Sequence, residues 1–168
     1  CNFGCKFCHN KYLLQPDAGN NYELDNLVSK IKTNPLVSSI SITGGEPTLQ
    51  NDITEFCKKL KEAEKYVSLD TNGSFPSKIN RILTYINRIA LDLKADPQDR
   101  ERYQKISNCQ IKTQKIIETI EIVNKIPEID FEIRTTYVEN LMNCEDIDNI
   151  IKFLVKKDFR GNYVLQQY

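Results

Sequence analysis

The sequence opens with Cys1-Asn-Phe-Gly4-Cys5-Lys-Phe-Cys8-His-Asn10, which places three of the six cysteines in one short loop. Thiolates this close in sequence can all turn toward one soft metal centre, and Gly4 helps the loop to wrap around it. A 4Fe–4S cluster normally takes four cysteine ligands. Three local cysteines would leave one iron open, as a catalytic metal site requires.

Two other interpretations of this loop stay open on the spacing alone. The three cysteines and His9, the only histidine in the chain, could form a closed zinc site. A disulfide fits less well, because three is an odd number and nothing marks the chain as secreted. We expect Cys57, at core helical spacing, to be structural, while the isolated Cys109 and Cys144 argue against a second cluster.

The composition is that of an ordinary globular domain, and we expect residues 1–168 to form a single domain. The 23 Lys and Arg residues balance 23 Asp and Glu residues, so no net charge draws the chain toward nucleic acid or a membrane. No apolar run approaches membrane-spanning length. No initiator methionine precedes Cys1, which predicts that the sequence is an N-terminally truncated segment of a longer chain.

Hydrophobic periodicity predicts helices and strands that alternate along the chain. The expected helices lie near residues 24–31, 53–60, 79–86, 100–105, 116–123 and 147–154. The expected strands lie near residues 37–43, 66–70, 89–94, 131–137 and 162–168. This alternation predicts an α/β fold with a parallel sheet that right-handed crossovers close into an open barrel. No strand precedes the cysteine loop, so the barrel is expected to lack its first strand.

Glycines and charged residues gather where the expected strands end, which is where parallel α/β folds bind ligands. Gly44, Gly45 and Gly73 directly follow strands, and this predicts close backbone approach to a ligand. Tight turns are the alternative explanation. Asp92 and Lys94 project to the same strand face, where partly buried charges must find partners.

Taken alone, each charge at these strand ends has an ordinary structural explanation. Glu46 could simply stabilise a helix N-terminus, Asp70 could cap a turn, and Asp92 could form an ion pair with Lys94. Arg134 is in the same situation on its own strand. All of these charges converge where the cysteine loop is expected to lie. Together they therefore predict a binding site.

These motifs resemble those of the radical S-adenosylmethionine (SAM) superfamily. The resemblance lies in Cys1-x3-Cys5-x2-Cys8, with Phe7 before the third cysteine, and in Gly44-Gly45-Glu46-Pro47. Within the superfamily, the glycyl-radical-enzyme activating enzymes are similar in Cys8-His9-Asn10, Gly44–Gln50, Asp70-Thr71-Asn72-Gly73 and Asp92-Leu93-Lys94. Arg134-Thr135-Thr136 and Tyr163-Val-Leu-Gln166 look most like the branch that activates anaerobic ribonucleoside-triphosphate reductase.

The resemblance implies a partial (β/α)6 barrel in which Cys1, Cys5 and Cys8 are catalytic and hold a 4Fe–4S cluster. The open iron would chelate the amino and carboxylate groups of SAM. Reduction would cleave SAM and yield a 5′-deoxyadenosyl radical that abstracts hydrogen from a glycine of a partner enzyme. The protein would supply positioning and the exclusion of water.

The resemblance also implies which residues contact SAM. The expected cofactor-binding residues are Phe7, His9, Gly44, Gly45, Glu46, Asp70, Thr71, Asp92, Leu93, Lys94 and Arg134. Phe7 would lie along the adenine, and Gly45 with Glu46 would hold the methionyl ammonium. Asp70, Thr71 and Asp92 resemble a monovalent-cation site. The chain departs from some activating enzymes at its last strand, which ends in Gln167-Tyr168 where they have a histidine.

The implied partners are a glycyl radical enzyme, in this branch the anaerobic ribonucleoside-triphosphate reductase, and a low-potential electron donor such as flavodoxin or ferredoxin. The expected location is the cytoplasm, without nucleic acid or membrane. Two other functions stay open. One is a radical SAM enzyme that acts on a small molecule, a peptide or RNA. The other is a zinc-bearing binding module, which leaves Lys94 and Arg134 unexplained.

Overall fold

The computed structural model describes residues 1–15 and 18–168, which form an α/β fold. In this part of the chain, five parallel strands make one sheet in the order β1-β2-β3-β4-β5. The strands are β1 (Ser39–Ile42), β2 (Tyr66–Thr71), β3 (Arg88–Asp92), β4 (Asp130–Tyr137) and β5 (Asn162–Gln167). Strands that follow one another in sequence are neighbours in space, as their alternation with helices predicted.

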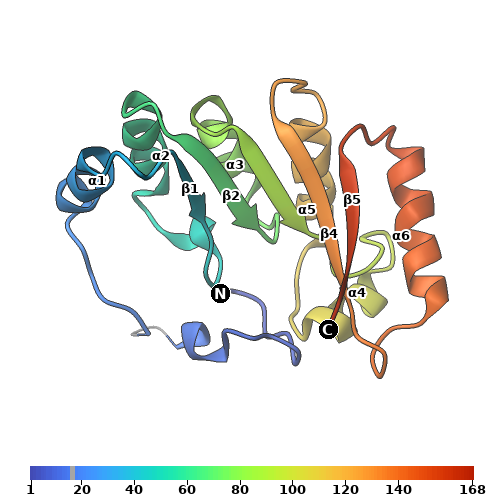
Figure 1. Ribbon diagram of the computed structural model, residues 1–168. Helices are drawn as coiled ribbons and strands as arrows, with labels where there is room; N and C mark the ends of the chain where they lie inside the picture. The colour runs from blue at the N-terminus through green and yellow to red at the C-terminus, as the bar shows by residue number, and fades with distance from the viewer. Residues whose placement is uncertain (16–17) are drawn as a thin grey trace.

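Helices connect the strands and cover one face of the sheet. They are α1 (Leu24–Thr33), α2 (Ile53–Glu62), α3 (Pro76–Ile82), α4 (Arg100–Ser107), α5 (Thr113–Val123) and α6 (Cys144–Lys156). In Figure 1, α2, α3 and α5 lie behind the sheet, and the N-terminal loop passes below the ends of the strands together with α4. This arrangement confirms the α/β class and the partial barrel. Among the described residues, no helix combines the length and apolar character needed to cross a membrane.

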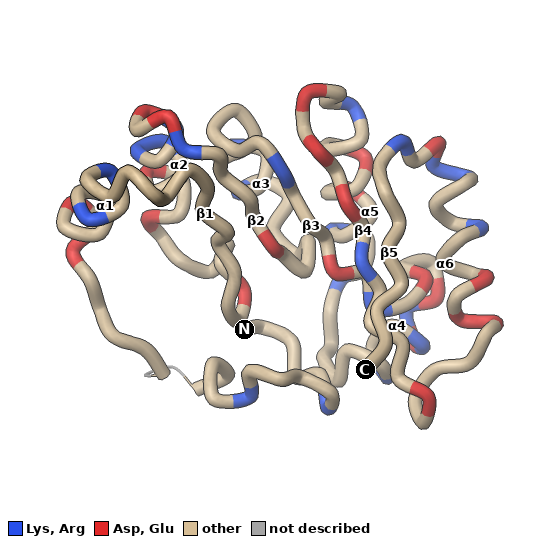
Figure 2. The backbone as a smooth tube through the Cα atoms, in the orientation of Figure 1, with Lys and Arg blue, Asp and Glu red and all other residues tan. Residues whose placement is uncertain are grey.

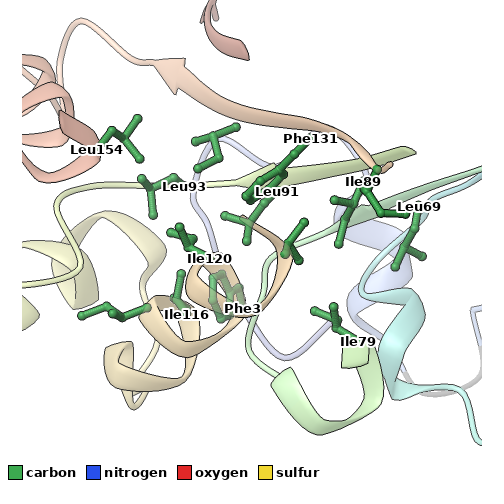
Figure 3. Close-up of a cluster of buried hydrophobic side chains, with 14 of the residues drawn as sticks. Phe3, Leu69, Ile79, Ile89, Leu91, Leu93, Ile116, Ile120, Phe131 and Leu154 are labelled. Carbon is green, nitrogen blue, oxygen red and sulfur yellow. The ribbon is translucent and has the colours of Figure 1, made fainter. Parts of the chain in front are cut away.

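The hydrophobic core lies between the sheet and these helices. Leu69 of β2 and Leu91 of β3 are fully buried and belong to the same cluster as Ile116 and Ile120 of α5. Figure 3 shows Phe3 of the cysteine loop beside this cluster. The loop is therefore anchored in the core by an apolar side chain, and its cysteines keep a defined position relative to the strands.

Helix α4 links the cysteine loop, the end of β3 and the start of α6. Its fully buried Tyr103 meets the ring of Phe3 edge-on, with centroids 6.5 Å apart. The hydroxyl of Tyr103 accepts a hydrogen bond of 3.2 Å from the backbone N–H of Lys94. Arg102 donates from Nε to Oδ1 of Asp146 over 2.6 Å. Three segments that are distant in sequence are thus held in one arrangement.

Several expected elements are shorter in the structure than the periodicity predicted, among them the strand expected over residues 37–43, which spans Ser39–Ile42. The helix expected over residues 79–86 is divided into α3 and a 3₁₀ turn, η3 (Leu83–Tyr85). The strand expected to reach Lys94 ends at Asp92. The backbone N–H of Leu93 still donates to the Arg134 carbonyl of β4 at 2.8 Å, and the backbone N–H of Lys94 donates to the Tyr103 hydroxyl. Hydrophobic periodicity does not contain the tertiary contacts that accompany the ends of these elements.

The ion pair between Arg102 and Asp146 predicts a pH dependence of stability. The hydrogen bonds that the Arg102 side chain donates to Asp146 hold the pKa of the Asp146 carboxyl below its usual range. Because the folded-state pKa is depressed, the pair stabilises the fold above about pH 5, and this contribution is lost as the pH falls through the folded-state pKa. We expect urea denaturation to show a steeper loss of unfolding free energy on acidification for the wild type than for Asp146→Asn.

The matched control is Asp148→Asn, because Asp148 is exposed on the same helix and forms no ion pair among the described residues. Its pH dependence should follow that of the wild type. Parallel curves for Asp146→Asn and the wild type would show that the ion pair contributes nothing to acid stability.

Candidate active site

The cysteine loop and the carboxyl ends of the strands enclose a cavity of about 220 Å³. Its lining consists of Cys1, Phe3, Cys5, Phe7, Cys8, His9, Asn10, Thr43, Gly44, Gly45, Asp70, Thr71, Asn72, Asp92, Lys94, Arg134 and Thr136. All the residues that the sequence assigned to a cofactor site line this cavity, except Glu46 and Leu93. Residues from four strand ends and the N-terminal loop therefore meet at one place.

The three clustered cysteines all reach this cavity. Cys5 is buried, Cys1 and Cys8 are half-buried, and all six cysteines of the chain are free thiols. In the described residues, no three side chains of His, Cys, Asp or Glu gather around one point where a single metal ion would sit. An iron–sulfur cluster binds each cysteine through a different iron, so its ligands can stand apart. Three soft thiol donors around one cavity fit such a cluster.

A lysine stands beside these thiols. The Lys94 ammonium lies 5.7 Å from the centroid of the Phe7 ring and 3.2 Å from Oδ2 of Asp92. Burial raises the pKa of the Cys5 thiol, and the positive charge of Lys94 offsets part of that rise. Because a metal binds the thiolate, cluster binding at Cys5 releases a proton, and a nearby cation favours the charged ligand.

The Gly44-Gly45 turn lets the end of β1 touch the cysteine loop. Gly44 has a φ of 137°, which side chains other than glycine rarely adopt. A Cβ added to Gly45 would lie 2.7 Å from the backbone nitrogen of Cys1. The sequence predicted a close backbone approach at these glycines. At Gly45, the structure shows that Cys1 of the protein's own cysteine loop makes a close approach.

Glu46 is buried, and its carboxylate points into the protein rather than into the cavity. It accepts hydrogen bonds from the backbone N–H and hydroxyl of Thr48, from the Thr71 hydroxyl at 2.8 Å and from the backbone N–H of Asn72 at 2.7 Å. These bonds engage both carboxylate oxygens and join the ends of β1 and β2. Glu46 thus braces the rim of the site, which differs from the ligand contact that the sequence suggested.

Asn72 carries a contact that sequence reasoning missed. Its side-chain Nδ2 donates to Oδ1 of Asn2 at 2.8 Å and lies 3.9 Å from Sγ of Cys1. Asn2 in turn donates to the Ser74 hydroxyl at 2.9 Å. The loop after β2 therefore holds the cysteine loop from the side. The stretch 70–73 stood out in the sequence, but the partner of this side chain lies seventy residues away.

Leu93 does not reach the cavity. It is fully buried in the hydrophobic core, where Figure 3 shows it among the apolar side chains. Successive residues along an extended chain point to opposite faces, so Asp92 and Lys94 face the cavity and Leu93 faces the helices. The alternation of apolar and polar residues along this strand therefore argues against the SAM contact that the motif resemblance implied for Leu93.

Arg134 lies between two aspartates at the inner face of the sheet. Its Nη2 is 3.2 Å from Oδ2 of Asp70 and 3.1 Å from Oδ1 of Asp92. Burial disfavours the charged guanidinium, but Asp92 and Asp70 outweigh this and raise the pKa of Arg134. Asp70 and Asp92, two of the three residues expected to hold a monovalent cation, therefore already pair with the Arg134 guanidinium. Within the described chain, Oδ1 of Asp70 is buried without a hydrogen-bond partner.

Aromatic residues close the side of the cavity next to β5. Phe7 is buried and meets the ring of Tyr168 edge-on, with centroids 6.1 Å apart. The exposed His9 lies 5.0 Å from the same Tyr168 ring. Tyr168 thus packs beside the cysteine loop. Its contribution to the site was not apparent from the sequence.

Comparison with known proteins assigns this arrangement to a family. The sequence model of the radical SAM superfamily matches residues 1–154. The chain belongs to the radical SAM superfamily. This superfamily uses a 4Fe–4S cluster and SAM, so both are cofactors of this radical SAM enzyme. The cavity with its three cysteine thiols fits that cofactor pair.

Two named relatives are similar in sequence to this radical SAM chain over most of its length. Two proteins of Methanocaldococcus jannaschii, both named as candidate glycyl-radical enzyme activating enzymes, are 35% identical over 164 residues and 33% identical over 178 residues. The alignments cover 94% and 100% of this chain and 61% and 69% of the two relatives. The chain therefore spans about two thirds of their length.

A solved structure shares the fold. The Streptococcus suis protein SuiB, in a crystal structure with its precursor peptide SuiA, superposes with a TM-score of 0.78 at 20% sequence identity. The superposition covers all of this chain and 37% of SuiB. Identity at this level supports the radical SAM fold and leaves the substrate open.

The cysteine assignment predicts a sharp difference between two single substitutions. After anaerobic reconstitution with iron and sulfide, Cys5→Ala should lose the bound cluster, because one of its three ligands is removed. Cys144→Ala should keep the iron and sulfide content of the wild type, since Cys144 is exposed at the start of α6. Iron and sulfide analysis with the visible absorption spectrum measures both. A fully loaded Cys5→Ala protein would contradict the assignment.

Proposed function

We propose that this radical SAM protein activates a glycyl radical enzyme. The observation that carries the proposal is its similarity, at 35% and 33% identity, to two proteins named for that activity. The cavity supports it, because thiols, two aspartates, a lysine and an arginine surround one space. Within the resemblance to activating enzymes, we propose the branch that serves anaerobic ribonucleoside-triphosphate reductase.

The proposed reaction needs one electron and one hydrogen atom. When bound and reduced, the cluster and SAM supply a 5′-deoxyadenosyl radical, with methionine as the other product. The hydrogen abstracted from the glycine Cα ends in 5′-deoxyadenosine, and the unpaired electron stays on the partner's glycine. The protein itself has no bond to make or break, so its contribution is to bind, orient and exclude water.

We assign these tasks to the residues that line the cavity. Lys94 and Arg134 carry the positive charges that suit the carboxylate of SAM, and Asp70 and Asp92 hold the Arg134 guanidinium in place. Phe7 provides an apolar ring for the adenine, with its position held by Tyr168. Glu46 acts indirectly, by bracing the strand ends that carry Gly45 and Thr71.

The remaining partner and location follow from the same chemistry. The cluster must receive its electron from a low-potential carrier such as flavodoxin or ferredoxin. Free thiols and low-potential electrons belong to a reducing compartment, so we propose the cytoplasm. The alternative substrate classes, a small molecule, a peptide or RNA, predict SAM cleavage without a radical on a partner protein.

Lys94 gives a direct test of SAM binding. Lys94→Ala should weaken SAM binding by roughly 10- to 100-fold, because a charge-assisted hydrogen bond of about 1.5–3 kcal/mol is lost. Anaerobic calorimetry measures the Kd, and iron analysis should show an intact cluster. Lys152→Ala, on the exposed side of α6, is the matched control. Unchanged SAM affinity in Lys94→Ala would show that this residue has another role.

The partner enzyme gives the test of the activity itself. The full-length protein is mixed anaerobically with a reductant, SAM and the reductase from the same organism. Electron paramagnetic resonance should show a glycyl radical on the reductase, with one 5′-deoxyadenosine formed for each radical. If SAM is cleaved and no partner radical forms, the activating function is wrong and the superfamily assignment stands.

A further inference from the structure

Two segments of this chain carry positive charge without any acidic residue. Residues 1–15 contain two lysines and no Asp or Glu, and residues 102–117 contain three lysines and one arginine and again no Asp or Glu. The chain as a whole has equal numbers of the two signs, and Glu101 and Glu118 directly flank the second segment. Figure 2 shows the described part of the N-terminal loop in tan and blue without red.

These two segments lie against each other in the fold. The backbone N–H of Gly4 donates to the carbonyl of Ser107 at 3.2 Å, and Nδ2 of Asn108 donates to the carbonyl of Gly4 at 3.0 Å. The thiol of Cys109 donates to the carbonyl of Asn2 at 3.0 Å. The end of α4 is thus bonded to the cysteine loop, so the segments that carry Lys6 and Lys105 are joined at this point.

The lysines of this region are exposed and available. We call them the basic face, which consists of Lys6, Lys11, Lys105, Lys112 and Lys115. Within the described residues, none of the five forms an ion pair, whereas Arg102 is engaged with Asp146. Lys6 lies between the predicted cluster ligands Cys5 and Cys8 in sequence and points to solvent while Cys5 is buried. A partner on the basic face is therefore close to the cluster.

We propose that the basic face is the docking surface for an acidic, low-potential electron-carrier protein. This rests on the proposed function, since it supplies the electron that SAM cleavage consumes. One electron passes from the carrier's reduced flavin or iron–sulfur centre to the cluster, and the carrier leaves oxidised by one electron. Opposite charges speed such encounters and orient the two proteins, and the attraction weakens with salt.

A protein carrier fits the basic face better than RNA does. The free charges are all lysines, which act as point charges, whereas phosphate recognition favours the planar guanidinium of arginine. Electron transfer requires the donor to approach the cysteine loop from outside, and the basic face borders that loop. RNA as a substrate would instead have to reach the cavity at the strand ends.

The test compares two double variants with the same change in net charge. Lys11→Glu with Lys112→Glu alters the basic face and leaves every cavity residue in place. Lys30→Glu with Lys32→Glu, on exposed positions of α1, is the matched control. Stopped-flow absorbance follows reduction of the reconstituted cluster by an acidic flavodoxin in its hydroquinone form. At low ionic strength we expect about a tenfold or larger loss of the second-order rate for the first variant only.

Further measurements make the outcome specific. Lys11→Gln with Lys112→Gln should give an intermediate rate, and the difference from wild type should shrink as salt is added. Photoreduced 5-deazaflavin, a small reductant that needs no docking surface, should support equal SAM cleavage in all variants. Equal flavodoxin rates in wild type and the first variant would overturn the proposal, as would an equal loss in the control.

Two other results separate this proposal from its alternatives. If the first variant loses salt-sensitive binding of total tRNA in a filter assay while its flavodoxin rate is unchanged, the basic face serves RNA and the proposal is wrong. If deazaflavin gives no SAM cleavage in the wild type, but calorimetry shows flavodoxin binding that depends on Lys11 and Lys112, the proposed function fails. In that case the docking surface stands.

Discussion

The buried carboxylate of Glu46 is the interaction on which the candidate active site depends. It joins the ends of β1 and β2 through Thr71 and Asn72, and Asn72 passes the connection to Asn2 in the cysteine loop. A buried carboxylate is costly without partners, so its hydrogen bonds strongly favour one arrangement of these loops. The close contact between Gly45 and Cys1 follows from that arrangement. The position of the cysteines therefore depends on a residue that does not line the cavity.

The inner face of the sheet carries a second organising feature, a row of alternating charges. Arg88 pairs with Glu132, Arg134 bridges Asp70 and Asp92, and Lys94 completes the row beside Asp92. In a partly buried cavity these charges interact more strongly than in water and are held in place before a ligand arrives. SAM carries an ammonium, a carboxylate and a sulfonium, so it meets both signs of charge there. The basic face outside the cavity presents five exposed lysines without ion pairs in the described residues, which suits an acidic protein instead.

Much of the fold was predictable because strand and helix periods are local properties of the chain. The sheet order and the helix on each crossover follow from alternating apolar patterns and from the handedness of such crossovers. The ends of elements were less predictable. Strand β3 ends at Asp92, and two residues later the backbone N–H of Lys94 donates to Tyr103, a residue of the following helix. The motif resemblance placed Leu93 in the site, yet the alternation of strand faces puts it in the core.

The cysteine spacing indicated a soft-metal loop, and the periodicity located the strand ends that carry the charged residues. Which of those residues face a ligand and which bind one another depends on the tertiary structure. Glu46 and Thr71, Asn72 and Asn2, and Asn108 and Gly4 are pairs far apart in the chain. A hydrogen bond depends on distance and angle between two groups, and these are set only when the strands, helices and loop have packed together.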